Sequence, residues 1–275
     1  MKQVKIAAPL YIVREECEKD LFSVLEKLKS MGFDGIEFLG FFGKAPKDLR
    51  EKLTELQLEA VGNHVDYYEF RDNLDKTIAV HKEIGCSFIT INGLPKEKFS
   101  DQEAVSRYCE DAALIGKRCK EQGITLLYHN HDRELTCKAG EHYFLEEILD
   151  HVPSEYLSFE PDLGWMAIGG AKPEYFLEKY QERCPIIHLK DYYAADTTKI
   201  GNVFELNGQK GDKEHSFFEF RPTGYGILNT PALMPGIMSC APEWLLADHD
   251  LAYERDSYFD LQISLEYIKN LLLRQ

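Results

Sequence analysis

Short apolar runs alternate with longer amphipathic segments along this 275-residue chain, and this alternation is the strongest constraint on its fold. Short apolar runs without clean alternation are typical of parallel strands that are buried on both faces. The segments between them show helical periodicity, as where Leu21, Val24, Leu25 and Leu28 recur at three- and four-residue steps. Eight runs predict strands, at residues 4–9, 35–39, 59–64, 87–92, 124–129, 156–161, 185–190 and 244–248.

The spacing of these runs predicts the architecture. Units of one strand and one helix that repeat every 25 to 35 residues or so indicate an α/β protein with a parallel sheet. Eight such units predict a single (β/α)8 TIM barrel over residues 1–275. About 55 residues separate the seventh and eighth expected strands, which is unusually long. We expect residues 203–220 to be an insertion over the mouth of the barrel, with a hairpin around N-G-Q-K-G-D.

Composition argues against several classes of protein. No segment approaches the roughly 20 apolar residues of a membrane-spanning helix, and the N-terminus lacks a secretory signal, so we expect a cytoplasmic protein. Seven scattered cysteines without a C-x-x-C pair disfavour a disulfide framework or a cysteine zinc site. The net charge of −15 disfavours nucleic-acid binding, which depends on cations that contact phosphates. A homo-oligomer is compatible with the sequence, which does not decide the oligomeric state.

Polar residues concentrate where the expected strands end, which is where (β/α)8 enzymes carry their active sites. His129 and His131 stand one residue apart at the fifth strand end and would face the same side if the strand continues. Imidazoles with carboxylates suit a divalent ion other than Ca²⁺, with Mn²⁺ or Zn²⁺ favoured over Co²⁺, Fe²⁺ and Mg²⁺. Such an ion would polarise a sugar carbonyl and stabilise an enediolate as a proton leaves the next carbon. The strand-end residues are Glu37, His64, Asn92, His129, Asn130, His131, Glu160, Asp162, His188, Lys190, Asp191, Asp248, His249 and Asp250.

Each candidate also has a purely structural interpretation. His129 could be a hydrogen-bonded core histidine, and Asp162 could cap the turn that follows it. The segment D-H-D (248–250) offers three candidates for one inward position. Glu37 and Lys190 could form a structural ion pair. The other histidines are expected on helix or loop surfaces and receive no role: His81, His142, His151 and His215.

Five segments carry a family resemblance. They are G-F-D-G-I-E-F (32–38), L-L-Y-H-N-H-D-R-E-L (126–135), F-E-P-D-L-G-W-M-A-I-G-G (159–170), I-I-H-L-K-D (186–191) and W-L-L-A-D-H-D (244–250). Together they resemble the sugar phosphate isomerase/epimerase family with the xylose isomerase-like barrel, which is related to inosose dehydratase and endonuclease IV. The resemblance runs almost from end to end, and Y-H-N-H together with H-L-K-D is quite specific for this branch.

The resemblance implies one metal ion, and its ligands carried over by position are His129, Asp162, His188 and Asp248. His129 stands where many members have glutamate, and Asp248 stands where the branch usually has the longer glutamate, which weakens the case for a two-glutamate epimerase mechanism. G-Y-G (224–226) likewise replaces the branch's G-E-G. Around the ion we expect His131, Lys190 and Glu37 to act in catalysis, and His64, Asn92, Asn130 and Trp165 to contact the substrate.

The sequence therefore predicts a divalent-metal-dependent sugar isomerase or epimerase that removes a proton next to a carbonyl. A keto-sugar or keto-inositol lyase or dehydratase is the alternative, because elimination begins with the same proton transfer. A non-catalytic sugar-binding subunit is less favoured because four ligands are in place. An abasic-site endonuclease is also less favoured, since Trp165 stands where that group has a zinc ligand. The expected partner is a small sugar or sugar derivative, free or phosphorylated, and not nucleic acid or a membrane.

Overall fold

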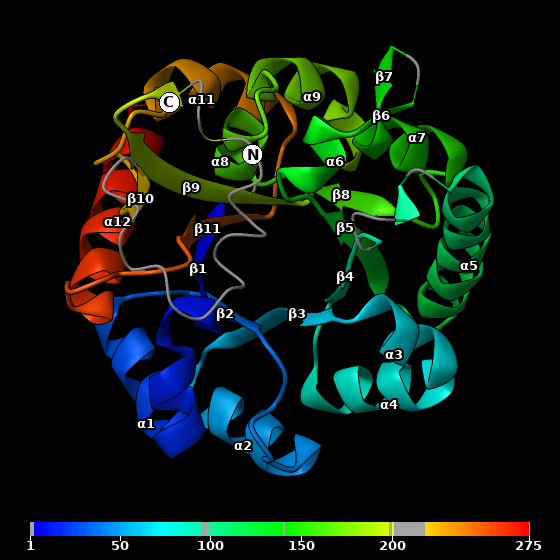
Figure 1. Cartoon of the computed structure of the whole chain (residues 1–275). Coiled ribbons are helices and arrows are strands. Elements are labelled where there is room, and N and C mark those ends of the chain that lie inside the picture. The colour runs from blue at the N-terminus through cyan, green and yellow to red at the C-terminus, as the bar shows by residue number, and fades with distance from the viewer. Residues whose placement is uncertain are drawn as a thin grey trace.

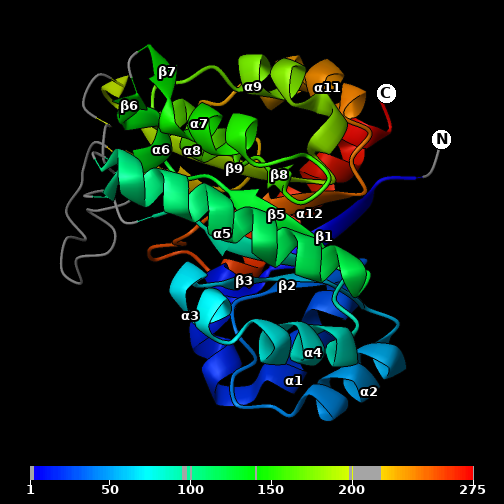
Figure 2. The ribbon, with the colours of Figure 1, turned by 90° about the vertical axis from the view of Figure 1, so that its right-hand side faces the viewer.

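The computed structural model describes residues 3–94, 98–99, 101–139, 141–197, 200 and 218–274. Its strands form one nine-stranded sheet in the order β10-β9-β11-β1-β2-β3-β4-β5-β8 and a separate two-stranded sheet, β6-β7. Within the large sheet, β10 alone is antiparallel to its neighbour. The other eight strands are parallel and curl around a common axis with helices on the outside (Figures 1 and 2). This arrangement is an α/β TIM barrel.

The parallel strands confirm the eight predicted ones, although several boundaries shift. The strands are β1 (Lys5–Pro9), β2 (Gly35–Phe38), β3 (Glu59–Val65), β4 (Phe88–Asn92), β5 (Thr125–His129), β8 (Ser158–Glu160), β9 (Ile186–Ala194) and β11 (Trp244–Asp248), with β10 (Phe218–Arg221), β6 (Lys138–Ala139) and β7 (His142–Tyr143) outside the barrel. The helices are η1 (Leu10–Val13), α1 (Arg14–Met31), α2 (Pro46–Leu56), α3 (Tyr67–Asp72), α4 (Leu74–Ile84), α5 (Gln102–Glu121), α6 (Arg133–Thr136), α7 (Phe144–His151), α8 (Leu163–Ile168), α9 (Pro173–Lys179), η3 (Gln181–Arg183), α11 (Thr230–Ser239) and α12 (Ser257–Leu272).

β8 and β9 are the first and last of the parallel strands in the order around the barrel. They meet near the carboxyl ends of the strands, where the polar residues lie. A single parallel bridge joins Asp162 to His188, and the His188 N–H donates to the Pro161 carbonyl over 2.9 Å. This contact fixes the end of the sixth barrel strand against the seventh. It therefore also fixes the distance between two of the predicted metal ligands.

β9 runs past the rim of the barrel, four residues beyond its predicted end at Lys190. Its last residues pair with β10 in antiparallel register, from Phe218 opposite Ala194 to Arg221 opposite Asp191. The predicted insertion falls mostly outside the described residues, and with it the hairpin expected around N-G-Q-K-G-D. Its last three residues, 218–220, belong to β10.

Asp191 anchors the loop that contains G-Y-G (224–226). Its carboxylate accepts backbone N–H groups from Tyr192 at 2.8 Å, Gly224 at 3.1 Å, Gly226 at 3.0 Å and Leu228 at 3.0 Å. A Cβ on Gly226 would lie 2.1 Å from Asp191 Oδ1, so this position requires glycine. Burial raises the pKa of Asp191, although the four donors act in the opposite direction. The loop between β10 and α11 is thus tied to the end of β9.

Capping residues mark where several helices begin and end. Gly32 and Gly85 adopt φ of +97° at the C-caps of α1 and α4, as the glycines before the second and fourth strands predict. Asp66 and Asp256 each accept two backbone N–H groups at the N-caps of α3 and α12. The helices therefore stop and start where the chain must turn to or from the barrel.

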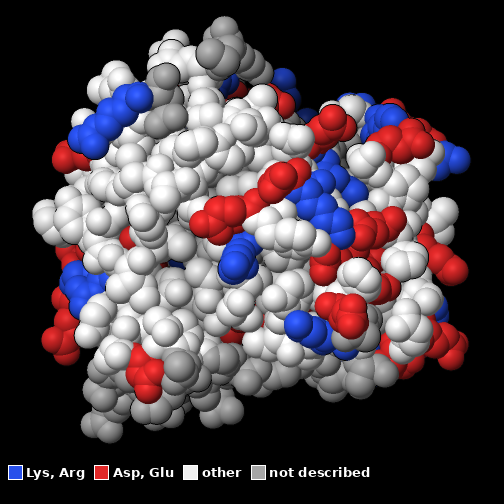
Figure 3. All heavy atoms as spheres, turned by 90° about the horizontal axis from the view of Figure 1, so that it is seen from above, with Lys and Arg blue, Asp and Glu red and all other residues white. Residues whose placement is uncertain are grey.

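The surface agrees with the composition. On the face shown in Figure 3, Lys and Arg side chains are interspersed with Asp and Glu and do not gather into a basic patch. Within the described residues, no helix combines the length and the apolarity that crossing a membrane requires.

Candidate functional site

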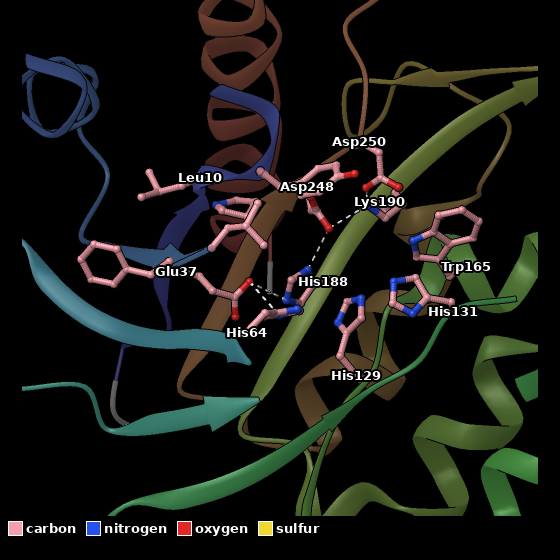
Figure 4. A pocket seen from close by; sticks show the side chains of 14 residues that line it. Leu10, Glu37, His64, His129, His131, Trp165, His188, Lys190, Asp248 and Asp250 are labelled. Carbon is pink, nitrogen blue, oxygen red and sulfur yellow. Dashed lines mark hydrogen bonds and ion pairs between the residues drawn. The ribbon is translucent and has the colours of Figure 1, made fainter. Parts of the chain in front are cut away.

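The carboxyl ends of the barrel strands surround a cavity of about 190 Å³ (Figure 4). Its apolar lining comes from the end of β1 and the helix η1 that follows it, from the end of β2 and from α8. It consists of Pro9, Leu10, Tyr11, Phe38, Leu39 and Trp165. Its polar lining contains seven predicted site residues and Asp250: Glu37, His64, His129, His131, His188, Lys190 and Asp248. Most of the site residues that were predicted at strand ends therefore lie in one pocket.

Three imidazoles and one carboxylate of the pocket lining, from His64, His129, His188 and Glu37, converge with the buried carboxylate of Glu160, which does not itself line the pocket. His64 Nε2 lies 3.2 Å from both Glu37 Oε2 and Glu160 Oε2. His129 Nδ1 lies 3.4 Å from Glu160 Oε2, and His188 Nε2 lies 3.4 Å from Glu37 Oε2. One donor atom from each of His64, His129, Glu160 and His188 lies within 4.8 Å of all the others. We call these four residues the histidine–glutamate set.

Many of these atoms are buried without a hydrogen bond. Six of them make no hydrogen bond with any described residue: Glu37 Oε1, His64 Nε2, His129 Nδ1, both oxygens of Glu160, and His188 Nε2. The three imidazoles have carboxylate oxygens at ion-pair distances of 3.2 to 3.4 Å. Buried polar atoms without a hydrogen bond are nevertheless costly, so a group of them that faces one point is a candidate metal-binding cluster. Imidazole nitrogens together with carboxylate oxygens are donors that fit Mn²⁺, Zn²⁺ or a similar divalent ion.

A second group lies beside the first. Asp248 Oδ2 accepts from His188 Nδ1 at 2.9 Å and from Lys190 Nζ at 2.8 Å. Lys190 Nζ also contacts Asp250 and lies 3.5 Å from Asp162 Oδ2. Because its Nδ1 is engaged with Asp248, His188 presents Nε2 to the histidine–glutamate set, as in a carboxylate–histidine–metal arrangement.

The structure thus distributes the four ligands implied by the resemblance over two groups. His129 and His188 face Glu160 and belong to the histidine–glutamate set, whereas Asp162 and Asp248 face Lys190. Donor atoms of Asp162, His188 and Asp248 nevertheless lie within 4.8 Å of one another. His188 is the residue that the two groups share.

Opposite charges in the histidine–glutamate set shift its pKa values. Burial lowers the pKa of His64, but the carboxylates of Glu37 and Glu160 outweigh burial and raise it to about 10. The pKa of His188 is also raised, because the same two carboxylates overcome burial. Burial lowers the pKa of His129 well below its ordinary value. In the absence of a metal ion, the neighbouring carboxylates therefore favour the doubly protonated, positively charged forms of His64 and His188.

His131 lies next to the histidine–glutamate set at the pocket wall. Its ring centroid is 5.0 Å from that of His129 and 5.5 Å from that of Trp165. Its backbone N–H donates to Glu134 Oε2 at 3.0 Å, and Glu134 Oε1 accepts from the Tyr128 hydroxyl at 3.0 Å. The buried Glu134 thus fixes the backbone that carries His131.

Two other predicted residues brace the site. The Asn130 amide donates to the Asp162 carbonyl at 3.3 Å and accepts the Asp162 N–H at 3.0 Å, which joins the ends of β5 and β8. Asp162 Oδ1 accepts the Trp165 N–H at 2.8 Å, so one oxygen caps α8 while the other faces Lys190. Asn130 is not among the residues that line the pocket, and the side chain of Asn92 lies outside the described ones.

Glu160 was predicted to lie at a strand end, but no role was predicted for it. The signal was available, because Glu160 and Asp162 are two residues apart and face the same side of the chain, as His188 and Lys190 do. Glu160 also pairs in register with His129 on the neighbouring strand. Asp250, which contacts Lys190, likewise received no role.

His81 corrects a prediction, since it is only 2% exposed and not a surface residue. It lies with Ile78 and Ile84 on the buried face of α4. Its Nε2 lies 2.9 Å from Asn63 Nδ2, and Asn63 Oδ1 accepts the Gly40 N–H at 2.7 Å. The polar partner Asn63 explains how a histidine is accommodated on that face. His142 and His151 are exposed as predicted, and His215 lies outside the described residues.

Comparison with known proteins connects this geometry to one family. The chain is 26% identical over 137 residues to an inosose dehydratase of Bacillus cereus (strain AH820), a match that covers 48% of this chain and 45% of that protein. The chain therefore spans about half the length of the curated relatives it matches.

Solved structures match over nearly the whole chain. A sugar phosphate isomerase/epimerase from Parabacteroides distasonis ATCC 8503 superposes with a TM-score of 0.74 at 19% identity, over 98% of this chain and 94% of that one. The IOLI protein, solved with a bound zinc atom, gives a TM-score of 0.71 at 12% identity, and the match covers 98% of this chain and 99% of that one. At such identities these two matches show the fold alone.

The family itself is shown by sequence. A family model described as a xylose isomerase-like TIM barrel matches residues 25–237, which is well over half of the chain. The chain therefore belongs to the xylose isomerase-like TIM barrel family.

Proposed function

We propose that this protein is a divalent-metal-dependent enzyme that removes a proton from the carbon next to a carbonyl of a sugar or sugar derivative and acts as an isomerase or epimerase. The observation that carries the proposal is a convergence of buried nitrogen and oxygen atoms that make no hydrogen bond. They belong to His64, His129 and His188, which line the pocket at the carboxyl end of the barrel, and to Glu160 beside them. A bound divalent ion supplies Lewis-acid stabilisation of the negative charge that develops on a substrate oxygen.

The histidine–glutamate set is the proposed ligand set, with Glu37 beside it. It shares His129 and His188 with the set that the resemblance implies. Asp248 then orients His188 through Nδ1 and is not itself a ligand. Mn²⁺ or Zn²⁺ fits three imidazoles and one carboxylate better than Mg²⁺, which prefers oxygen ligands.

The remaining pocket residues take their roles from position. His131 is the proposed proton acceptor, because it lines the pocket next to His129. Glu37 is the second candidate for proton transfer, while Lys190 contributes a fixed positive charge. Trp165 and the apolar side chains after β1 and β2 offer a surface for the carbon face of a sugar and keep water from the reacting atoms.

A keto-sugar or keto-inositol lyase is the second candidate. The match to an inosose dehydratase favours it. Elimination begins with the same proton removal, so the residues proposed above would serve both reactions and differ only in whether a neighbouring oxygen substituent then leaves.

One experiment tests the function and separates the two candidates. The protein, loaded with Mn²⁺, is incubated in D₂O with ketohexoses, inososes and 3-keto-glucosides in turn, and the products are followed by NMR. Exchange of the hydrogen next to the carbonyl, dependent on Mn²⁺ and on His131, supports the proposal. An isomerised or epimerised product indicates the first candidate and an unsaturated product the second. If neither exchange nor product appears with any of these substrates, the proposal fails.

Metal binding is expected to weaken as the pH falls. The pKa of His64 is raised to about 10, so its imidazole is doubly protonated at neutral pH in the metal-free protein, and the raised pKa of His188 favours the same form there. A metal ion must displace these protons, so the apparent affinity for Mn²⁺ should rise about 10- to 100-fold for each pH unit between roughly pH 6 and 8. Titration calorimetry in two buffers of different ionisation enthalpy would count the released protons. A pH-independent affinity would contradict the proposed ligands, and His64→Asn should release fewer protons than the unaltered chain.

A further inference from the structure

Lys190 lies among three carboxylates at the wall of the pocket. Its side chain is 1% exposed. Its ammonium lies 2.8 Å from Asp248 Oδ2 and 3.5 Å from Asp162 Oδ2, and it contacts Asp250 Oδ1. Figure 4 shows the Lys190 side chain directed towards Asp248 and Asp250. We call Asp162, Asp248 and Asp250 the aspartate group.

Packing fixes the backbone and the Cβ of Lys190. A Cβ on Gly164 would lie 2.6 Å from the Lys190 carbonyl oxygen and 2.8 Å from Lys190 Cβ, so the start of α8 packs directly on β9 at this residue. The rings of Trp165 and Phe220 lie 5.9 and 5.5 Å from Lys190 Nζ. Two aromatic rings thus lie close to a cation whose other neighbours are carboxylates.

Two members of the aspartate group, Asp162 and Asp248, have the properties of a cation site together with His188. Donor atoms of Asp162, His188 and Asp248 lie within 4.8 Å of one another. Asp162 Oδ2 is buried and makes no hydrogen bond among the described residues. Buried carboxylates this close repel one another unless a positive charge lies between them. Oxygen-rich donors of this kind suit a hard divalent ion such as Mn²⁺.

We infer that the Lys190 ammonium is a built-in cation that takes the place of a second divalent ion, so that the protein holds one exchangeable metal ion and not two. This inference rests on the proposed function for the first ion, which lies in the histidine–glutamate set. His188 connects the two positions, with Nε2 towards the exchangeable ion and Nδ1 towards Asp248, which Lys190 neutralises. Lys190 is therefore a residue that determines metal stoichiometry.

The test is the number of Mn²⁺ ions bound per chain. The unaltered protein, Lys190→Ala and Lys190→Arg are stripped with chelator, reloaded with MnCl₂, freed of excess metal and measured by elemental mass spectrometry and titration calorimetry. We expect one ion in the unaltered protein, two in Lys190→Ala and one in Lys190→Arg, which keeps a cation among the carboxylates. Asp162→Asn in the Lys190→Ala background should return the number to one.

The outcomes separate this inference from the proposed function. One ion in both the unaltered protein and Lys190→Ala overturns the inference and leaves the proposed function standing. No ion in the unaltered protein and one in Lys190→Ala supports the inference but contradicts the proposed first site. If Lys190→Ala unfolds without metal, recovery of its thermal transition in millimolar MnCl₂ but not in MnCl₂ with excess chelator supports the inference. A chain that stays unfolded in MnCl₂ overturns it.

Discussion

Replacing Glu160 by glutamine is expected to lower the affinity for Mn²⁺ by more than about 100-fold. Glu160 contributes the carboxylate of the histidine–glutamate set, and its Oε2 lies 3.2 Å from His64 Nε2 and 3.4 Å from His129 Nδ1. The change keeps the shape of the side chain but removes the negative charge that attracts the metal ion. Loss of a residue that only orients a ligand costs about 10- to 100-fold, and loss of a charged ligand should cost more. Titration calorimetry with MnCl₂ at fixed pH measures the difference.

The matched control is Asp248→Asn, which is also isosteric and also removes one buried carboxylate from the candidate site. In the proposed arrangement Asp248 acts on the metal only through His188 Nδ1, so its loss should reduce the affinity less than the loss of Glu160. The ligand set implied by the family resemblance gives the opposite order, because there Asp248 is a direct ligand. A larger effect of Asp248→Asn would therefore reject the histidine–glutamate set. The thermal transitions of both metal-free variants show whether either change disturbs the fold.

The barrel was predictable because its strands are buried on both faces. A strand between the barrel interior and the outer helices is mostly apolar, so β5 (T-L-L-Y-H) and β11 (W-L-L-A-D) stand out from the amphipathic helices around them, and their last residues are polar. The extension of β9 to Ala194 was not predictable, since residues 191–194 pair with β10, more than twenty positions further along the chain. Local patterns do not encode such a distant partner.

The location of the site was also predictable, but its division into two groups was not. Strand ends of a parallel barrel meet at one edge, so polar residues there must lie close together. Glu160 and Asp162 both face inward, and the sequence does not say which of them faces Lys190. That choice depends on the bridge between Asp162 and His188, a contact between the two ends of the sheet. His81 shows the same limit, because its burial depends on the amide of Asn63 on a different element.

Replacing Gly116 by alanine is expected to destabilise the protein by about 3 kcal/mol or more, although alanine is the better helix former by about 1 kcal/mol. Gly116 lies within α5, where an added Cβ would be 1.8 Å from the carbonyl oxygen of Tyr156. Backbone cannot yield as a flexible side chain can, so α5 or the segment before β8 must move. The midpoint of thermal unfolding should fall by roughly 5–10 °C.

Gly123→Ala is the matched control, because Gly123 follows α5 and has nothing within 4 Å of an added Cβ. Its φ of +77° predicts a loss of only about 1–2 kcal/mol. Tyr156 lies just before β8, the strand that carries Glu160, so a displacement there also moves a proposed ligand. Gly116→Ala should therefore weaken Mn²⁺ binding, and Gly123→Ala should leave it unchanged. If Gly116→Ala is as stable as the unaltered chain, the contact between α5 and Tyr156 does not position β8, and the geometry of Glu160 must be set elsewhere.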